Sequence, residues 1–193
     1  MINMANINRI NKGIWWFITQ YIYKRRFGKI GRGTILFKPM QLDNVKAITI
    51  SEGVFIAEGA WLMGAKEQIK TLRINEGTVI GHFSHIVGIS SVCIEKNVLM
   101  ADHIFISDCT HNYEIIEKPI GKQSIKFIKP VTIGEGSWLG ENVCVCGANV
   151  GKHCVIAANS VVTNDIPDYC VAAGSPARVV KKYNFENKMW EKN

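Results

Sequence analysis

Residues 131–143 read VTIGEGSWLGENV, and this stretch decides the fold. Its aliphatic residues Ile133 and Leu139 lie six positions apart, and Val145 continues the spacing. Outward from here the same spacing recurs in four more sets: Ile50, Ile56 and Leu62; Ile74, Ile80 and Ile86; Ile94, Met100 and Ile106; Val150, Ile156 and Val162. An α-helix repeats every 3.6 residues, so a six-residue frame is not helical.

Small residues keep fixed places in this frame. Glycine or alanine often follows the aliphatic residue, as at Gly81 and Gly134, and a small or branched residue often lies four positions after it, as at Ser137 and Ser160. A parallel β-helix explains both features, because each unit is then a short strand plus a tight corner, with the aliphatic residue pointing inward. Three units predict a triangular coil of about 18 residues. A β-sandwich is the alternative, but fifteen aliphatic positions in one frame argue against it.

The frame breaks in two places. The interval from Ile106 to Ile133 is longer than four units and is not a whole number of them, so we expect residues 108–129 to leave the prism as an insertion loop. Long loops on a rigid repeat scaffold are usually functional. The second break is small, because the interval from Val145 to Val150 is one position short of a full unit.

The two ends of the chain lack the repeat. Apolar residues over 7–27 have helical spacing, so we expect 1–28 to be a helical cap on the open end of the prism. The β-helix is expected over 29–175, and residues 176–193 are expected to form a short helical tail. The resulting fold class is all-β, with helices only at the ends.

Composition narrows the classes of protein. A chain of 193 residues with 47% hydrophobic and 20% charged residues suits one globular domain. The net charge of +7 attracts anions, but no zinc-finger spacing or RNA-binding aromatic signature accompanies it, so no nucleic acid partner is expected. No signal peptide is apparent, which favours reduced cysteines in a cytoplasm. Cys144 and Cys146 are two apart, which is not zinc-ligand spacing, and no metal is expected.

Residues 150–183 read VGKHCVIAANSVVTNDIPDYCVAAGSPARVVKKY. Together with the repeats, this run resembles the hexapeptide-repeat acyltransferases, closest to the maltose/galactoside and polysaccharide O-acetyltransferases. The resemblance covers about residues 31–183 and implies a left-handed coil, a homotrimer and acetyl-CoA as co-substrate. Two features depart from the family: Asn164 stands where many relatives have lysine, and the unit at 143–151, VCVCGANVG, is shortened where relatives have Pro-Gly and one more residue.

In that family the catalytic histidine lies in a projecting loop ahead of the VTIG segment. The matching stretch here is ISDCTHNYE, residues 106–114, which gives His111. An imidazole with a pKa near 7 can take the proton of an attacking hydroxyl and return it to the thiolate. Asp108 and Glu114 are the residues expected to orient the imidazole.

The resemblance also indicates binding residues. His85 and Ser84 lie on the preceding coil and Asn112 and Tyr113 follow His111, so these four are expected at the acceptor. The expected coenzyme A contacts are Trp138 at the pantetheine arm, backbone around Gly140 and Ala158, Thr163 and Asn164 near the phosphates, and the cations Arg178 and Lys181.

Three functions remain open at this stage. The first is transfer of acetyl to a hydroxyl of a sugar or glycan of a capsule, a lipopolysaccharide or a related saccharide, without an acyl-enzyme. The second is N-acetylation of a nucleotide-linked amino sugar by the same fold and base. The third is a β-helix scaffold or carbonic-anhydrase-like protein, which would need zinc between subunits.

The apolar residues from Ile14 to Tyr23 are too few to span a bilayer, which needs about 20. They include Trp15 and Trp16, and the run Lys24, Arg25 and Arg26 follows. Aromatic and basic residues favour a membrane interface, although aromatic residues can instead cover the prism end. We therefore expect a cytoplasmic protein, either free or associated with the inner face of the membrane.

Overall fold

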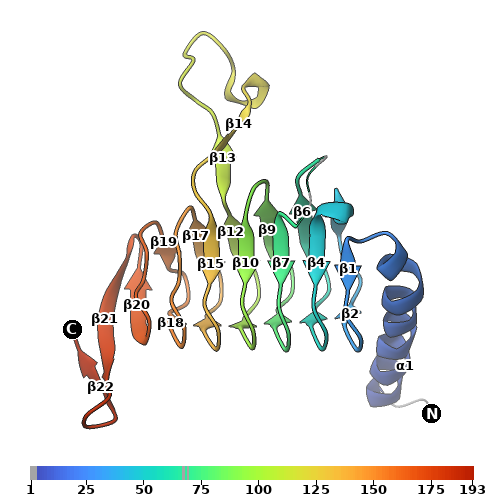
Figure 1. Ribbon diagram of the computed structural model, residues 1–193, viewed down its shortest axis with the longest axis horizontal. Helices are drawn as coiled ribbons and strands as arrows, with labels where there is room; N and C mark the ends of the chain where they lie inside the picture. The colour runs from blue at the N-terminus through green and yellow to red at the C-terminus, as the bar shows by residue number, and fades with distance from the viewer. Residues whose placement is uncertain (1–3, 67, 69) are drawn as a thin grey trace.

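The computed structural model describes residues 4–66, 68 and 70–193, and it shows a left-handed parallel β-helix (Figure 1). Face A holds β1 (Lys29–Ile30), β4 (Ile48–Ile50), β7 (Leu72–Ile74), β10 (Val92–Ile94) and β15 (Val131–Ile133). Face B holds β2 (Ile35–Leu36), β5 (Phe55–Ile56), β8 (Val79–Ile80), β11 (Leu99–Met100), β16 (Trp138–Leu139), β18 (Val155–Ile156) and β20 (Cys170–Gly174). Face C holds β3 (Gln41–Asp43), β6 (Trp61–Gly64), β9 (His85–Gly88), β12 (Phe105–Ser107), β17 (Cys144–Cys146) and β19 (Val161–Val162).

The interior of the prism confirms the six-residue frame. All fifteen aliphatic residues of the frame are at most 2% exposed. They stack strand on strand, as where Ile80 pairs with Met100 and Met100 with Leu139. The tight corners also appear, since a Cβ on Gly134 would lie 2.4 Å from the backbone carbon of Gly151.

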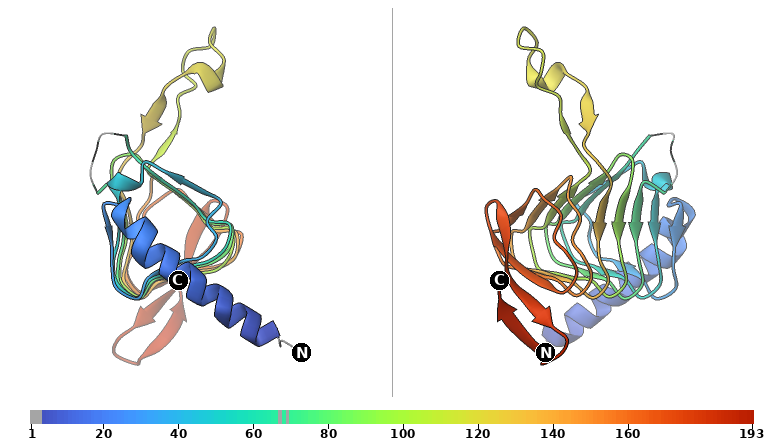
Figure 2. Two further views of the ribbon diagram at one scale, coloured as in Figure 1. Left: turned by 90° about the vertical axis from the view of Figure 1, so that its right-hand side faces the viewer. Right: turned by 60° about the vertical axis from the view of Figure 1, so that its left-hand side comes forward.

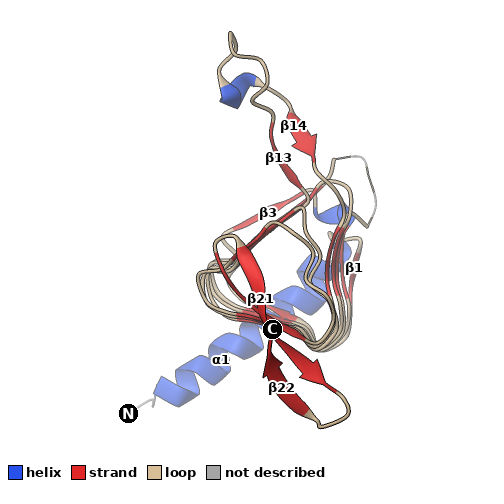
Figure 3. Ribbon diagram, turned by 90° about the vertical axis from the view of Figure 1, so that its left-hand side faces the viewer, coloured by secondary structure: helices blue, strands red, loops and turns tan. Residues whose placement is uncertain are grey.

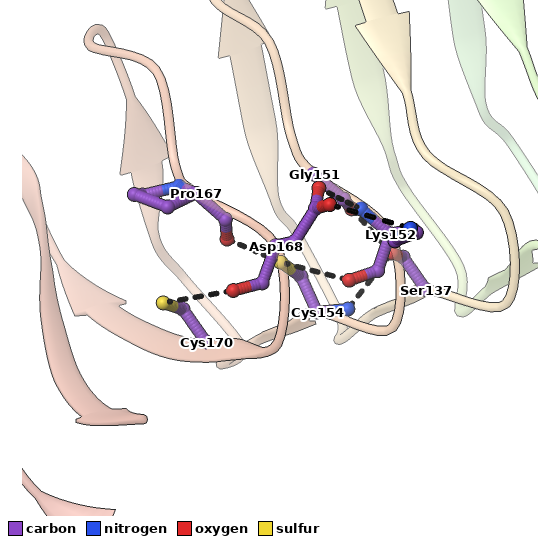
Figure 4. A network of polar contacts seen from close by, with 7 residues as sticks. All are labelled: Ser137, Gly151, Lys152, Cys154, Pro167, Asp168 and Cys170. Atoms are coloured by element: carbon purple, nitrogen blue, oxygen red, sulfur yellow. Dashed lines mark hydrogen bonds and ion pairs between the residues drawn. The ribbon is translucent and has the colours of Figure 1, made fainter. Parts of the chain in front are cut away.

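Buried polar groups at the corners are hydrogen-bonded. The Ser137 hydroxyl donates to the Gly151 carbonyl at 2.8 Å and accepts from the Cys154 amide at 2.9 Å. The Cys154 thiol in turn donates to the Pro167 carbonyl at 3.0 Å (Figure 4). Small polar residues therefore link one coil to the next without leaving these donors unpaired in the core.

The coils differ in length, whereas three equal units per coil are expected. From face A to B, and from B to C, the inward residues keep the six-residue spacing, as in Ile50, Ile56 and Leu62. Every irregularity falls at the corner between faces C and A. The step there is shorter than one unit from Val145 to Val150, slightly longer than one unit from Ile86 to Ile94, and longer than four units from Ile106 to Ile133. The residues of this corner lie between the paired strands, so strand stacking does not fix their number.

The longest of these corners is the segment 108–129, which projects from the prism as an arm (Figure 1). Its base is an antiparallel pair, β13 (Cys109–His111) and β14 (Ile125–Phe127), and its tip includes the short helix η4 (Ile120–Lys122). The Gln123 side chain ties the tip together by donating to the carbonyls of Ile115 and Lys118 at 2.9 and 2.8 Å. The arm is therefore an ordered hairpin on a rigid base.

The helical cap on the first coil is confirmed. It consists of α1 (Met4–Phe17), the π-helical turn η1 (Ile18–Ile22) and η2 (Tyr23–Arg25), and α1 crosses the end of the prism (Figure 2). The buried Thr19 hydroxyl accepts from the Leu36 amide at 3.0 Å, and the Gln20 amide donates to the carbonyls of Gly31 and Thr34. No helix within the described residues has the length and apolarity to span a bilayer. A further short helix, η3 (Val45–Ala47), lies in the first C–A corner.

The helix expected over 176–193 is wrong. This segment forms β21 (Ala177–Asn184) and β22 (Met189–Lys192), which extend face B as an antiparallel hairpin (Figure 3). The physical reason is the free edge of β20, whose backbone groups offer a ladder of hydrogen bonds that a helix would leave unused.

Candidate active site

A cavity of about 390 Å³ lies on the outside of face C, below the arm. Its floor comes from β6, β9, β12 and β17, and its rim from β13 and β14. The lining residues are Trp61, Met63, His85, Val87, Ile89, Phe105, Ser107, Cys109, Thr110, His111, Ile125 and Cys146. The cavity is mostly apolar with two imidazoles, which is typical of a small-molecule site.

His85 lies in the floor between two aromatic residues. Parallel pairing places Trp61, His85 and Phe105 in one row across face C. The imidazole stacks on Trp61 with ring centroids 3.9 Å apart and an 8° angle, and Phe105 meets it edge-on at 5.3 Å. Burial lowers the pKa of His85 below 6.5, and the nearby Asp43 carboxylate partly opposes that shift. The imidazole is therefore neutral at pH 7.

One ring nitrogen of His85 has no hydrogen-bond partner among the described residues. Its Nε2 is buried, and no described residue hydrogen-bonds to it. The neighbouring Asp43 carboxylate is already engaged, since Oδ2 accepts from the Trp61 indole at 2.8 Å and from the Gln41 amide at 2.7 Å. A buried nitrogen without a partner is costly, so a ligand group in the cavity is the natural partner for it.

His111 reaches the same cavity from the arm. It is the last residue of β13, it pairs with Ile125 of β14, and its side chain is exposed at the cavity rim. Within the described part of the chain, no hydrogen bond or ion pair holds its ring. An exposed imidazole above an apolar floor can accept a proton from a bound hydroxyl and pass it on.

The two carboxylates expected to orient His111 are engaged elsewhere. Asp108 is fully buried, and its carboxylate accepts from the backbone amides of Ile89, Ser90 and Ser91 at 2.8–2.9 Å. Glu114 forms an ion pair with Lys126 across the arm, which raises the pKa of Lys126. Asp108 therefore fixes the base of the arm, and neither carboxylate is bonded to the His111 ring.

The other residues expected to bind the acceptor substrate lie in different parts of the structure. Ser84 is fully buried inside the prism, where its hydroxyl donates to the Gly81 carbonyl at 3.0 Å, so it does not face the cavity and that expectation is corrected. Asn112 is the next residue after His111, and its side chain accepts from the Glu114 amide at 3.1 Å, which shapes the arm. Tyr113 is exposed on the arm, and its hydroxyl makes no hydrogen bond with the described residues.

Most of the expected coenzyme A residues lie on or beside face B. Cross-strand pairing links Trp138 to Val155, Val155 to Val171 and Val171 to Lys181, so Trp138 and Lys181 belong to one outward row. Gly140 packs on Ala158, whose amide nitrogen is 2.8 Å from the position of a Cβ on Gly140. Arg178 pairs with Ala173 beside this row. A strip of backbone and cations therefore runs along one edge of the prism.

Thr163 and Asn164 lie apart from this strip. They follow β19 at the corner between faces C and A, and both are exposed. The structure of one chain thus does not bring them together with Trp138. No group of three or more histidine, cysteine or acidic residues forms a metal-binding cluster among the described residues.

Sequence reasoning missed the aromatic floor of the cavity. Trp61 and Phe105 each directly precede an inward aliphatic residue, Leu62 and Ile106, in the third unit of a coil. Aligning the coils on these inward residues would have placed both aromatics in one row with His85. The signal was present, but the unequal coil lengths concealed it.

Comparisons with known proteins agree with this fold. The family model described as "Hexapeptide repeat of succinyl-transferase" matches residues 130–164. The putative lipopolysaccharide biosynthesis O-acetyl transferase WbbJ of Escherichia coli is 38% identical over 125 residues, covering 61% of this chain and 64% of that protein. The probable acetyltransferase Rv3034c of Mycobacterium tuberculosis is 33% identical over 184 residues, covering 91% of this chain and 60% of that protein.

Among solved structures, the N-acyltransferase AntD of Bacillus cereus, in complex with dTDP and 3-hydroxybutyryl-CoA, superposes with a TM-score of 0.71 at 15% identity. The alignment covers 88% of this chain and 90% of that chain, and it shows a shared fold. The chain spans less than two thirds of the length of the two curated relatives. The matched repeat and the relatives named as acetyltransferases confirm that this chain resembles the hexapeptide-repeat acyltransferases.

Proposed function

We propose that the protein is an acetyl-CoA-dependent O-acetyltransferase that modifies a hydroxyl of a sugar or glycan. The observation that carries this proposal is the cavity under the arm, where an exposed imidazole stands over an aromatic floor. Aromatic faces suit the apolar face of a sugar ring, and an imidazole suits removal of a hydroxyl proton. The relatives named as acetyltransferases supply independent support.

The chemistry assigned to His111 is general base catalysis. Its ring takes the proton of the acceptor hydroxyl while the oxygen attacks the thioester carbonyl. The new carbon–oxygen ester bond forms, the carbon–sulfur bond breaks, and the proton passes from the imidazole to the leaving thiolate. No acyl-enzyme is needed. A backbone N–H at the thioester would stabilise the oxyanion.

His85 is proposed as a binding residue for the acceptor rather than as the base. Its Nε2 is buried and has no partner among the described residues, so a hydroxyl of the acceptor would satisfy it. Stacking between Trp61 and Phe105 fixes the ring, which suits a residue that positions a substrate. Asn112 and Tyr113, on the arm next to His111, are proposed to contact the same acceptor from above.

The second candidate activity is N-acylation of a nucleotide-linked amino sugar. It is favoured by the similarity in fold to AntD, an N-acyltransferase crystallised with dTDP. The two activities share the base and differ in the bond formed. Mild alkali hydrolyses an ester and spares an amide, so product analysis before and after alkali decides between them.

We further propose that the protein assembles as a homotrimer that completes the coenzyme A site. Two prism faces have apolar outer rows: face B carries Phe55, Val79, Leu99 and Trp138, while face C carries Trp61 and Phe105. The outer row of face A is mostly polar, with Lys29, Thr49, Arg73 and Thr132 beside Cys93. Burying both apolar faces between three equivalent copies would also bring Thr163 and Asn164 of one copy towards the Trp138 strip of another.

The decisive experiment measures transfer from labelled acetyl-CoA to a panel of sugars, lipid-linked glycans and amino sugars. His111→Asn should lower kcat by about 100-fold or more and leave the Kd for acetyl-CoA nearly unchanged. His153→Asn is the control, because His153 has a φ of +49° that asparagine tolerates and it packs on Tyr169, outside the cavity. Near-normal turnover in His111→Asn would remove His111 as the base. A wild-type protein that transfers acetyl to no acceptor in the panel would contradict the proposed function. The expected cytoplasmic location follows from the use of acetyl-CoA.

A further inference from the structure

The outer surface of the cap carries an unusual group of exposed apolar side chains. Ile14, Phe17 and Tyr21 lie on the side of the helix opposite to Thr19, which is buried against the prism. They are 51%, 54% and 48% exposed. Phe17 stacks on Tyr21 with ring centroids 4.4 Å apart, and Trp16 meets Tyr21 edge-on. The cap therefore covers the core with one side and presents an aromatic cluster with the other.

A basic hollow lies directly beyond this cluster. Arg25 at the end of η2, Arg26 directly after it and Lys46 of η3 line a space of about 750 Å³, together with Asn44 and Val45. All three cationic side chains are exposed. Lys24 and Lys29 lie next to it in sequence, so the end of the prism combines positive charge with exposed aromatic rings. The arginine fork binds phosphate oxygens well.

We propose that this end of the prism docks on an anionic membrane, with the aromatic cluster at the lipid interface and a lipid phosphate group in the basic hollow. Aromatic rings favour the interface, and basic residues beside them are attracted to anionic headgroups. The helix is short and lies across the prism end, so it would rest in the interface rather than span the bilayer (Figure 2).

The positive charge of this end favours an anionic membrane over a second copy of the chain as its binding partner. A copy docked on this end through the same surface would bring the arginines of two cap regions together, in a protein whose net charge is already +7. Like charges brought together oppose such contact, whereas an anionic surface neutralises them. The arm does not obstruct this docking, because it projects from the side of the prism, away from the end that would touch lipid (Figure 1).

The test is co-sedimentation with vesicles of phosphatidylglycerol and phosphatidylcholine, against phosphatidylcholine alone, at low and moderate salt. The wild-type chain should bind only the anionic vesicles, and salt should weaken binding. Arg25→Gln/Arg26→Gln should weaken the partition constant about 30-fold, since each basic residue contributes about fivefold near such a surface and the two effects multiply. The matched control is Lys188→Gln/Lys192→Gln, which removes two charges from the hairpin at the opposite end.

The aromatic contribution is tested separately by Phe17→Ser/Tyr21→Ser, with Met40→Ser as the control at another exposed apolar residue. The first variant should lose at least about tenfold in binding to anionic vesicles, and the second should bind like wild type. The proposal would be overturned if millimolar inorganic phosphate abolished vesicle binding while the aromatic variant bound vesicles normally. That pair of results would indicate a site for a free anion. A wild-type chain that never sediments with vesicles would also overturn the proposal, as would an aromatic variant that changes only the oligomeric state in light scattering. No arm of the test depends on acetyl transfer.

Discussion

Replacing Asp108 tests whether this buried carboxylate supports the arm or takes part in the chemistry. The structure shows it at the point where the chain leaves β12 and enters the arm, shortly before His111. Its two oxygens accept three backbone hydrogen bonds, from Ile89 at 2.9 Å and from Ser90 and Ser91 at 2.8 Å. Asp108→Ala would leave all three amides without that acceptor.

The expected loss of stability follows from those three donors. An unsatisfied buried donor costs about 1–3 kcal/mol, but Ser90 is exposed, so water can reach part of this corner. We therefore expect about 3 kcal/mol in total, near the lower bound for each donor. For a chain of this size, each kcal/mol lowers Tm by about 2–4 °C, which gives a decrease of about 6–12 °C. Asp108→Asn keeps one acceptor oxygen and should lie between the two.

The assay is thermal unfolding by circular dichroism, with acetyl transfer measured on the same samples well below Tm. Asp165→Ala is the matched control, because Asp165 accepts from the Asn149 amide at 2.8 Å at an equivalent but exposed corner, and its ion pair with Lys129 lowers its pKa. That variant should lose less than about 1 kcal/mol. The reasoning is refuted if Asp108→Asn keeps the wild-type Tm and yet abolishes turnover, since the carboxylate would then act on His111.

Three further predictions follow from other sites. Because burial lowers the pKa of His85, the folded protein binds a proton at this imidazole less readily than the unfolded chain does. The stability of the folded protein should therefore be complete above about pH 6.5 and fall as the pH drops through that value. Urea titrations at about pH 7.5 and 5 should show this loss in the wild type and not in His85→Phe. Arg178→Ala should raise the KM for acetyl-CoA more than it lowers kcat, because a contact with the cofactor phosphates is equally strong in the ground state and the transition state. The opposite pattern in steady-state kinetics would exclude Arg178 from cofactor binding. Burial raises the pKa of Cys154 to about 11, so iodoacetamide at about pH 8 should leave this thiol unmodified in the native protein and label it after denaturation. Peptide mass spectrometry measures the labelling. Rapid labelling of the native protein would mean that the thiol is not packed as described.

The interior of the prism is predictable from the sequence because the interior repeats. Each inward residue is held by an equivalent residue one coil away, so position in the frame determines burial, as for Ile80 between Ile56 and Met100. The helical cap is also predictable, since a helix that covers a core has apolar residues at helical spacing. Both features depend on local pattern alone.

What could not be predicted depends on partners far away in sequence. The final hairpin forms because β20 has a free edge, and nothing in the composition of residues 177–192 indicates that edge. Proximity to His111 in sequence suggests a catalytic role for Asp108, whereas the donors that hold its carboxylate come from the preceding coil. The cavity floor was missed because coils of unequal length must be aligned before Trp61 and His85 become neighbours.

The restriction of all length variation to the corner between faces C and A has a consequence for how such a protein can change. An insertion of a single amino acid between Ile50 and Ile56 would turn the following inward side chains outward. By contrast, a short corner, from Val145 to Val150, and the longest, from Ile106 to Ile133, both return the chain to the same register. Evolution can therefore lengthen, shorten or exchange the segment above the cavity while the rest of the solenoid stays intact. A specificity loop from a related enzyme could be grafted at the same seam, and recipients of such grafts should keep the thermal stability of the parent.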